Sequence, residues 1–318
     1  MQYCAYRLAD IRTARFRSDG VKSFQKRPPP FRSTSLMYID TERGLTRYPP
    51  GRARNQRTPG RSGRPPRICC GRKESGAMEY HEIIAATGAG AAHPGGFGGT
   101  LDFLADAEVS PGQRVLEVGC GTGRTSCALA AMGCAVTAVD RSEAMLEKAK
   151  RRAALLGATI DFVQGDLRAL PFEAASFDIV FAESVTAFAP PAEAYREYAR
   201  VLRSGGRVWD RELYKIEADA PELDAEMYAL YGSAPLPTKS GWLESLKAAG
   251  FVRVGVWTPR DGRPFVVGSA ELEADPLQFI DLDRVLRPDV AAFTARNAAF
   301  LRRFGEALSY GVFIGENP

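Results

Sequence analysis

The stretch Val115-Leu116-Glu117-Val118-Gly119-Cys120-Gly121-Thr122-Gly123 decides how the chain folds. An apolar run from Arg114 to Val118 predicts a buried parallel strand that leads directly into a glycine-rich turn. A helix is expected from Arg124 to Met132. A strand, a glycine turn and a helix in this order form the nucleotide-binding corner of an open α/β sheet. Glycine suits this turn because a Cβ atom would keep the backbone away from a ligand.

Two classes of ligand use such a corner, and the glycine spacing separates them. A dinucleotide site requires G-x-G-x-x-G, in which the third glycine would fall at Arg124 when counting starts at Gly119. The sequence has E-x-G-x-G-x-G instead, with Glu117 two residues before the first glycine. A carboxylate there would repel a pyrophosphate, but it would attract a ligand that carries an ammonium group and a sulfonium cation.

The charge of the chain is divided between two unlike parts. Residues 1–77 contain 18 Lys and Arg against 5 Asp and Glu, whereas residues 78–318 contain 24 basic and 33 acidic residues. Because the second part is acidic, no nucleic acid is expected to bind it. Residues 1–77 have repeated prolines and few apolar patterns, which predicts a disordered basic extension that cannot bury enough surface to fold.

Three interpretations of residues 1–77 are open. A segment rich in arginine and poor in acids is typical of an organelle transit peptide. It also fits a basic arm that touches RNA or anionic surfaces. The third interpretation is an upstream extension from a misplaced start codon, which is favoured because Met78 opens a stretch that would make a natural beginning. No apolar run approaches the length of a membrane span, and no secretory signal is visible.

Cysteine and histidine usage limits the metal chemistry of the chain. The only histidines are His81 and His93, and the cysteines form no C-x-x-C pair, so no metal site is expected. Free thiols fit a reducing compartment, and we therefore expect a cytoplasmic protein. The cysteines are Cys4, Cys69, Cys70, Cys120, Cys127 and Cys134.

An acidic residue ends the second predicted strand, Ala135–Val139. Asp140 lies about twenty residues after the glycine turn, which is where a carboxylate binds the two hydroxyls of a ribose. A carboxylate can accept both of these hydrogen bonds. The helix expected from Ser142 to Gly157 follows, with the hydroxyl of Ser142 as its cap.

Two further acids follow the next two predicted strands. Asp166 can accept a hydrogen bond from an adenine amino group, while Leu167 packs on the ring. Glu183 ends the fourth strand. Ligands in open α/β sheets sit beyond the carboxyl ends of the strands. These two acids, Glu117 and Asp140 are therefore predicted to line one crevice that attracts cations.

The remaining chain continues the alternation of helices and strands. Helix is expected over 81–107 with an interruption at His93-Pro94-Gly95-Gly96-Phe97-Gly98-Gly99, interpreted as a lid over the ligand. Glycines at 205 and 206 are expected to stop the helix 192–202. The pattern predicts an α/β fold: a Rossmann-like open sheet of seven strands, mostly parallel with an antiparallel last strand, and helices on both faces. The other expected strands are 160–164, 177–181, 207–213, 251–257 and 310–314, and the other helices are 221–231, 240–249 and 290–308.

The glycine turn, the acids at strand ends and the sequence Arg200–Gly206 ahead of the fifth strand together resemble the class I S-adenosylmethionine (SAM) dependent methyltransferases. The similarity is to their small-molecule branch, often described as ubiquinone-biosynthesis-like or type 11. It covers about Val109 to Trp257 and the last strand. It implies SAM as cofactor and one methyltransferase domain over 78–318, with helical insertions near 214–240 and 258–308.

The resemblance also implies roles for individual residues. Glu117 would lie near the SAM amino group, and the turn 119–123 would wrap the methionine part. Asp140 would hold the ribose and Asp166 the adenine, while Glu183 would lie near the methionine end and the substrate. The cofactor-binding residues predicted in this way are Glu117, Gly119, Cys120, Gly121, Thr122, Gly123, Asp140, Arg141, Asp166, Leu167 and Glu183.

Methyl transfer needs a dedicated base only when the acceptor is a weak nucleophile, because SAM itself supplies the reactivity. His93 and Glu183 are the candidates for such a base, followed by Asp210 and Glu212 past the fifth strand, although each of these types is more often structural or cofactor-facing. Aromatic residues that could line an acceptor pocket, or simply form core, are Trp209, Tyr214, Tyr228, Tyr231 and Trp242.

The sequence therefore predicts a SAM-dependent methyltransferase that acts on a small molecule. An RNA or protein methyltransferase that uses the basic arm is an alternative, although the folded part is acidic and no N-P-P-Y type motif follows the fourth strand. A non-catalytic SAM-binding partner subunit is a second alternative, which no residue favours because the cofactor positions are intact. A nicotinamide oxidoreductase is disfavoured by Glu117 and Arg124.

Overall fold

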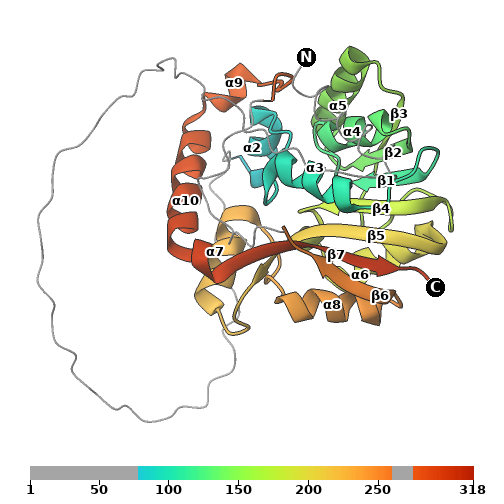
Figure 1. Ribbon diagram of the computed structural model, residues 1–318. Coiled ribbons are helices and arrows are strands. Elements are labelled where there is room, and N and C mark those ends of the chain that lie inside the picture. The colour runs from blue at the N-terminus through green and yellow to red at the C-terminus, as the bar shows by residue number, and fades with distance from the viewer. Residues whose placement is uncertain (1–77, 260–274) are drawn as a thin grey trace, which may run out of the picture. The chain divides into compact units, whose positions relative to one another are not determined.

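The computed structural model describes residues 78–259 and 275–318, so the predictions for 1–77 lie outside the described residues. Among the described residues, seven strands form one sheet in the order β3-β2-β1-β4-β5-β7-β6 (Figure 1). Strand β7 is antiparallel to both of its neighbours and the other pairs are parallel, as predicted. The strands are β1 (Arg114–Val118), β2 (Ala135–Asp140), β3 (Ile160–Gln164), β4 (Phe177–Glu183), β5 (Leu202–Lys215), β6 (Val252–Trp257) and β7 (Leu308–Glu316).

The helices follow the predicted order along the chain. Helix α5 begins after Ser142, whose hydroxyl accepts from the amide of Met145, and ends at Gly157, as predicted. The helices are α2 (Tyr80–Thr87), α3 (Gly96–Asp106), α4 (Arg124–Ala131), α5 (Glu143–Leu156), α6 (Pro191–Val201), α7 (Pro221–Tyr231), α8 (Lys239–Ala248), α9 (Leu282–Val285) and α10 (Pro288–Phe304), with short 3-10 turns η1 (Thr186–Phe188) and η2 (Gly305–Ala307).

Strand β1 lies in the middle of the parallel part of the sheet, between β2 and β4. Val115, Leu116 and Val118 are all buried, because both faces of a parallel sheet are covered and the strand is therefore apolar throughout. The chain moves outward from β1 to β2 and β3 and then returns to β4 on the other side of β1. Such a reversal of strand order opens a crevice between β1 and β4 at their carboxyl ends.

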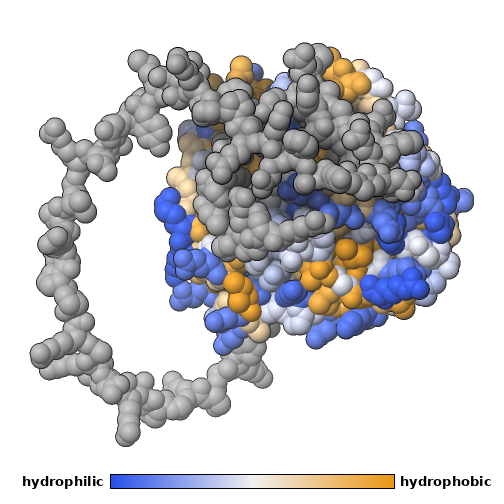
Figure 2. Space-filling model, viewed as in Figure 1, coloured by the Kyte–Doolittle hydropathy of each residue, from blue (hydrophilic) through white to orange (hydrophobic). Residues whose placement is uncertain are grey.

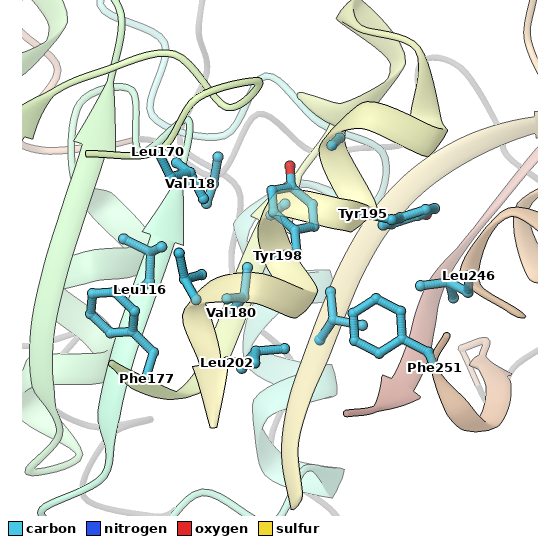
Figure 3. Packing of buried hydrophobic residues seen from close by; sticks show 14 of the residues in the cluster. Leu116, Val118, Leu170, Phe177, Val180, Tyr195, Tyr198, Leu202, Leu246 and Phe251 are labelled. Carbon is cyan, nitrogen blue, oxygen red and sulfur yellow. The ribbon is translucent and has the colours of Figure 1, made fainter. Parts of the chain in front are cut away.

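Alternate residues of β4 face two different hydrophobic cores, because successive side chains of a strand point to opposite faces. Ile179 and Phe181 pack on the side of α3 and α4. Val180 and Ala182 pack on the side of α6 and α8, in the core that Figure 3 shows. Helix α5 packs beside α4. The prediction of helices on both faces is thus confirmed.

The predicted position of the glycine loop was wrong. The interruption predicted at 93–99 lies instead between α2 and α3, because α2 ends at Thr87, where Gly88 caps it, and α3 already begins at Gly96. Gly99 is inside α3, and its carbonyl accepts from Nη2 of Arg211 at 2.9 Å. A Cβ at Gly99 would come within 3.2 Å of that guanidinium, so the glycine lets the arginine approach the helix.

The second wrong boundary is the glycine stop expected after helix 192–202. Helix α6 ends at Val201, and β5 begins with the next residue, so the glycines lie within the strand. Pairing with β4 shifts register between Phe177 and Ile179. Gly206 is required at this irregularity because a Cβ would come within 2.8 Å of the carbonyl oxygen of Arg203.

Helices α7 and α10, which come from the two predicted insertions, pack against each other beyond the end of the sheet (Figure 1). Helix α10 is shorter than expected, and β7 begins at Leu308 rather than at Tyr310. Their shared core contains Leu223, Met227 and Phe300.

Hydrophilic residues predominate on the described surface visible in Figure 2, and smaller hydrophobic patches interrupt them. Within the ranges that the structure describes, no helix is long and apolar enough to cross a membrane.

A buried ion pair fastens the segment before α9 to the glycine turn. Nη1 and Nη2 of Arg152, on α5, donate to the two carboxylate oxygens of Asp275 at 2.9 and 2.5 Å, and both side chains are less than a tenth exposed. Nε of Arg152 donates to the carbonyl of Thr122 at 2.9 Å. The pairing holds the pKa of Asp275 below its usual value although burial opposes this.

We expect Asp275→Ala to lower the free energy of unfolding by about 3 kcal/mol, because it leaves the buried guanidinium of Arg152 without a counter-charge. Urea unfolding of the full chain measures this. Glu222→Ala is the matched control: it removes an exposed partner of Arg303 and should change the free energy by less than about 0.5 kcal/mol. Equal, small effects of the two substitutions would contradict the assignment.

Candidate functional site

A cavity opens at the carboxyl ends of the parallel strands, where the reversal of strand order predicts a ligand site. The acids of the four strand ends, Glu117, Asp140, Asp166 and Glu183, all line it, so their predicted convergence is confirmed. The other predicted cofactor residues that line the cavity are Gly119, Cys120, Gly121, Thr122, Arg141 and Leu167.

The glycine turn fits tightly between β1 and the loop after β4. Gly119 has φ +71°, and a Cβ there would come within 2.7 Å of the side chain of Val185. Gly121 differs, since a Cβ at this residue would meet open space. Gly123, the predicted cofactor residue that does not line the cavity, instead lets α4 approach α5, where a Cβ would come within 2.9 Å of Ala149. The first and third glycines are therefore needed for packing, and the second leaves the backbone open toward the cavity.

Asp140 is fixed in place by the backbone of the turn. Its carboxylate accepts from the amide of Gly121 at 2.9 Å and from the amide of Ser142 at 2.8 Å. Burial raises the pKa of Asp140, while these hydrogen bonds oppose the shift. Each carboxylate oxygen keeps further capacity to accept, so the group can bind hydroxyls of a ligand.

Glu117 is almost entirely buried, and the hydroxyl of Ser126 donates to its carboxylate. Burial raises the pKa of Glu117 well above its usual value, and the charges of Glu183 and Asp140 act in the same direction. A ligand cation at this point would offset the cost of ionising Glu117.

Asp166 has a different environment, on the more open side of the cavity. Arg168 donates to both of its carboxylate oxygens, from Nε at 3.0 Å and from Nη2 at 2.6 Å. These hydrogen bonds lower the pKa of Asp166 to about 2. The neighbouring Leu167 also lines the cavity and packs against the core below β4.

Glu183 is held by three donors from three elements. Oε1 accepts from Nε of Arg211 at 2.9 Å and from Thr100 at 2.7 Å, and Oε2 accepts from Thr125 at 2.8 Å. Although burial raises the pKa of Glu183, the charge of Arg211 and the hydrogen bonds from Thr100 and Thr125 lower it overall. Because the carboxylate of Glu183 stays ionised and is held by three donors, the structure does not favour Glu183 as the general base.

His93 lies next to this carboxylate, in the loop between α2 and α3. Its Nε2 is 3.7 Å from Oε2 of Glu183, and its side chain is 8% exposed. Burial lowers the pKa of His93. The charges of Arg211 and Arg124 lower it further, whereas the charge of Glu183 raises it. The imidazole is therefore neutral at neutral pH.

Asp210 and Glu212, the more remote candidates for a base, lie within β5 rather than past it, behind the loop that follows β4. Asp210 accepts from the hydroxyls of Thr186 at 3.0 Å and Tyr195 at 2.7 Å, and Glu212 accepts from the amides of Thr186 and Ala187. Burial raises the pKa of Asp210 to about 7 and that of Glu212 well above its usual value. Both side chains hold the loop and lie outside the cavity lining.

The aromatic wall of the cavity comes from residues for which the sequence predicted no role in ligand binding. Tyr80, His81 and Phe188 line it, and their rings contact one another with centroids 4.5 to 5.8 Å apart. Burial raises the pKa of Tyr80 to about 12 and lowers that of His81 to about 4. No local pattern marks these residues, because α2 and η1 meet only in the folded chain.

The five aromatic residues considered for an acceptor pocket lie elsewhere. Trp209 and Trp242 are core, Tyr214 packs edge-on against Phe313, and Tyr228 is exposed on α7. Tyr231 packs edge-on against Tyr80, behind the wall. Besides the glycine turn and the strand ends, α2, the loop after it and the loop after β4 line the cavity. The described parts of the two insertions support α2 from behind.

Comparison with known proteins agrees with this geometry. A family model described as a methyltransferase domain matches residues 115–206. The chain is 31% identical over 237 residues to the uncharacterized methyltransferase YodH of Bacillus subtilis, and the match covers 74% of this chain and 97% of that protein. The chain belongs to the class I SAM-dependent methyltransferases.

Solved structures of other proteins have the same fold as this methyltransferase. Phosphoethanolamine N-methyltransferase 2 of Haemonchus contortus, in complex with SAM, has a TM-score of 0.59 at 20% identity, covering 74% of this chain and 56% of that one. The [4+2]-cyclase SpnF has a TM-score of 0.55 at 23% identity, covering 75% and 91%. At these identities the likeness shows the fold alone.

We expect Glu117→Gln to make the methyltransferase, without ligand, progressively more stable than the wild type as the pH rises above about 4.3, the usual pKa of Glu. The unfolded chain ionises Glu117 there, but the folded chain resists ionisation because the pKa is raised. The folded state then binds more protons, so wild-type stability falls with pH. Gln keeps an oxygen that can accept from Ser126.

Urea unfolding as a function of pH measures the difference between the two proteins. Glu147→Gln, at an exposed position on α5, is the matched control and should follow the wild type at every pH. A constant difference between Glu117→Gln and the wild type would contradict the raised pKa.

Proposed function

We propose that this methyltransferase transfers the methyl group of SAM to a small-molecule acceptor. The observation that carries the proposal is the convergence of four strand-end acids on one cavity beside the glycine turn. SAM carries an ammonium and a sulfonium cation, and a cavity lined by acids concentrates cations. The same acids would repel a pyrophosphate, which disfavours a nicotinamide dinucleotide as the ligand.

The polar groups of the cavity fit those of SAM. Glu117 would accept from the amino group, because its buried carboxyl ionises readily only beside a cation. Asp140 would accept from the ribose hydroxyls, since the backbone fixes its carboxylate at the end of β2. Asp166 and Leu167 would hold the adenine, and the open space over Gly121 would admit the methionine part.

When bound, SAM supplies a methyl group activated by its sulfonium. The chain aligns the acceptor with that methyl group and excludes water from the cavity. Tyr80, His81 and Phe188 would form the wall on the acceptor side. The acidic charge of residues 78–318 favours a small molecule over a nucleic acid.

The compartment and the alternative functions are proposed on the same grounds. Cys120, Cys127 and Cys134 are buried free thiols, which supports a reducing compartment such as the cytoplasm. The RNA or protein methyltransferase and the non-catalytic subunit gain no support from the cavity, because all four predicted acids line it.

We expect the full chain to bind SAM and not NAD in calorimetric titrations. Asp140→Asn should weaken SAM binding at least about tenfold, since hydrogen bonds to a charged acceptor contribute roughly 1.5–3 kcal/mol each and about 1.4 kcal/mol is a factor of ten. Asp161→Asn, an exposed acid on β3, is the matched control and should bind SAM like the wild type.

A folded full chain that does not bind SAM would contradict the proposed function. Unchanged affinity in Asp140→Asn would contradict only the ribose assignment.

A further inference from the structure

Nε2 of His93 is a buried polar atom to which the described part of the chain offers no hydrogen-bond partner. At 3.7 Å, its separation from Oε2 of Glu183 is too long for a hydrogen bond. Buried polar atoms normally have partners, so an exception on a residue that lines a cavity points to a group that a ligand can satisfy. His93 and Glu183 both line the cavity.

A second buried atom without a partner belongs to the loop after β4. The hydroxyl of Ser184 has no hydrogen bond among the described residues, although it is buried, and Ser184 also lines the cavity. Ser184 has φ +54°, which is unusual for a residue with a side chain, and its amide donates to the carbonyl of Arg211 at 2.7 Å. Backbone strain of this kind concentrates at functional sites.

The carboxylate behind His93 is rigid and locally neutralised. Arg211, Thr100 and Thr125 fix both oxygens of Glu183, and the guanidinium of Arg211 counters its charge. This end of the cavity therefore does not favour a cationic acceptor, unlike the end that contains Glu117 and Asp140. The fixed oxygen can still stabilise a proton that arrives on the imidazole, because opposite charges attract strongly where water is excluded.

Another wall of the same cavity is flat and apolar. The Tyr80 and Phe188 rings stack with an interplanar angle of 22° and centroids 5.8 Å apart, and both line the cavity. Flat aromatic surfaces of this kind suit a planar ligand. An unpaired imidazole nitrogen and an unpaired hydroxyl in the same cavity suit a hydroxyl group on that ligand.

We propose that His93 is the general base of this methyltransferase and that its acceptor is a planar, uncharged molecule with a weakly acidic hydroxyl, as in a phenol or an enol. The inference rests on the proposed function, since it presumes methyl transfer in this cavity. Glu183 is then a positioning residue that stabilises the protonated imidazole.

The step is balanced in atoms and charge. The acceptor oxygen forms a bond to the methyl carbon as the bond between that carbon and the sulfonium breaks, and the sulfur leaves as a neutral thioether. The hydroxyl proton passes to Nε2 of His93, so the positive charge of the sulfonium reappears on the imidazolium. Burial and the charges of Arg211 and Arg124 lower the pKa of His93, so the free imidazole is neutral. The charge of Glu183 raises this pKa and so stabilises the protonated imidazole.

The experiment uses the full chain saturated with S-adenosylhomocysteine, which cannot react, and 4-nitrophenol as the probe. The pH is set so that the probe is mostly neutral in water, and its absorbance separates phenol from phenolate. We expect the bound probe to show the phenolate band. We also expect the imidazole signal of His93 in NMR spectra to move to its protonated position.

Two variants make the assignment specific. Because the chain has only two histidines, the imidazole signal that is lost in His93→Gln is that of His93. Asp161→Asn, at an exposed position on β3, should retain the phenolate band. In His93→Gln the phenolate band should be lost, while unchanged affinity for S-adenosylhomocysteine shows that the protein is folded and its cofactor side is intact.

The possible results distinguish a failure of this inference from a failure of the proposed function. If S-adenosylhomocysteine does not bind to the folded wild type, the proposed function itself is wrong. If it binds but 4-nitrophenol does not, the acceptor class is overturned. If the probe binds as neutral phenol to the wild type, or as phenolate to His93→Gln as well, the assignment of His93 as base is overturned.

Discussion

The buried ion pair between Arg211 and Glu183 is the interaction on which the site depends. Neither charge is solvated by water, so each must be satisfied by the protein or it would destabilise the fold by several kcal/mol. Glu183 takes Thr100 and Thr125 as further donors, and Arg211 reaches the carbonyl of Pro94. One pair thus joins β4, β5, α3, α4 and the loop that carries the catalytic candidate.

This pair also divides the cavity electrostatically. On one side, Glu117 and Asp140 are acids whose pKa burial raises, so a ligand cation is the natural way to stabilise their charge. On the other side, the charge of Glu183 is already countered, and the groups that face the cavity are aromatic rings and neutral polar atoms. The division fits methyl transfer from a cationic donor, as in the proposed function, to an uncharged acceptor, as in the further inference.

The cofactor side could be predicted in detail, whereas the acceptor side could not. Strand ends carry Asp140 and Glu183 to one edge wherever the strands are parallel, so the spacing of acids along the chain was sufficient. His93 and Glu183 were separate candidates in the sequence, and only the fold places Nε2 of His93 within 3.7 Å of Oε2 of Glu183. The glycines at 205 and 206 predicted a helix stop and proved to lie in β5, because long-range strand pairing outweighed the local preference.

The sequence by itself determined the corner of β1, its glycine turn and α4, because burial of an apolar strand and backbone freedom at glycine are local properties. It also determined the family, since those local patterns occur together at fixed spacing. Only the tertiary structure decided which wall faces the acceptor and which charges are buried. Tyr80 and Phe188 are more than a hundred residues apart, and desolvation of Arg211 depends on every element packed around it.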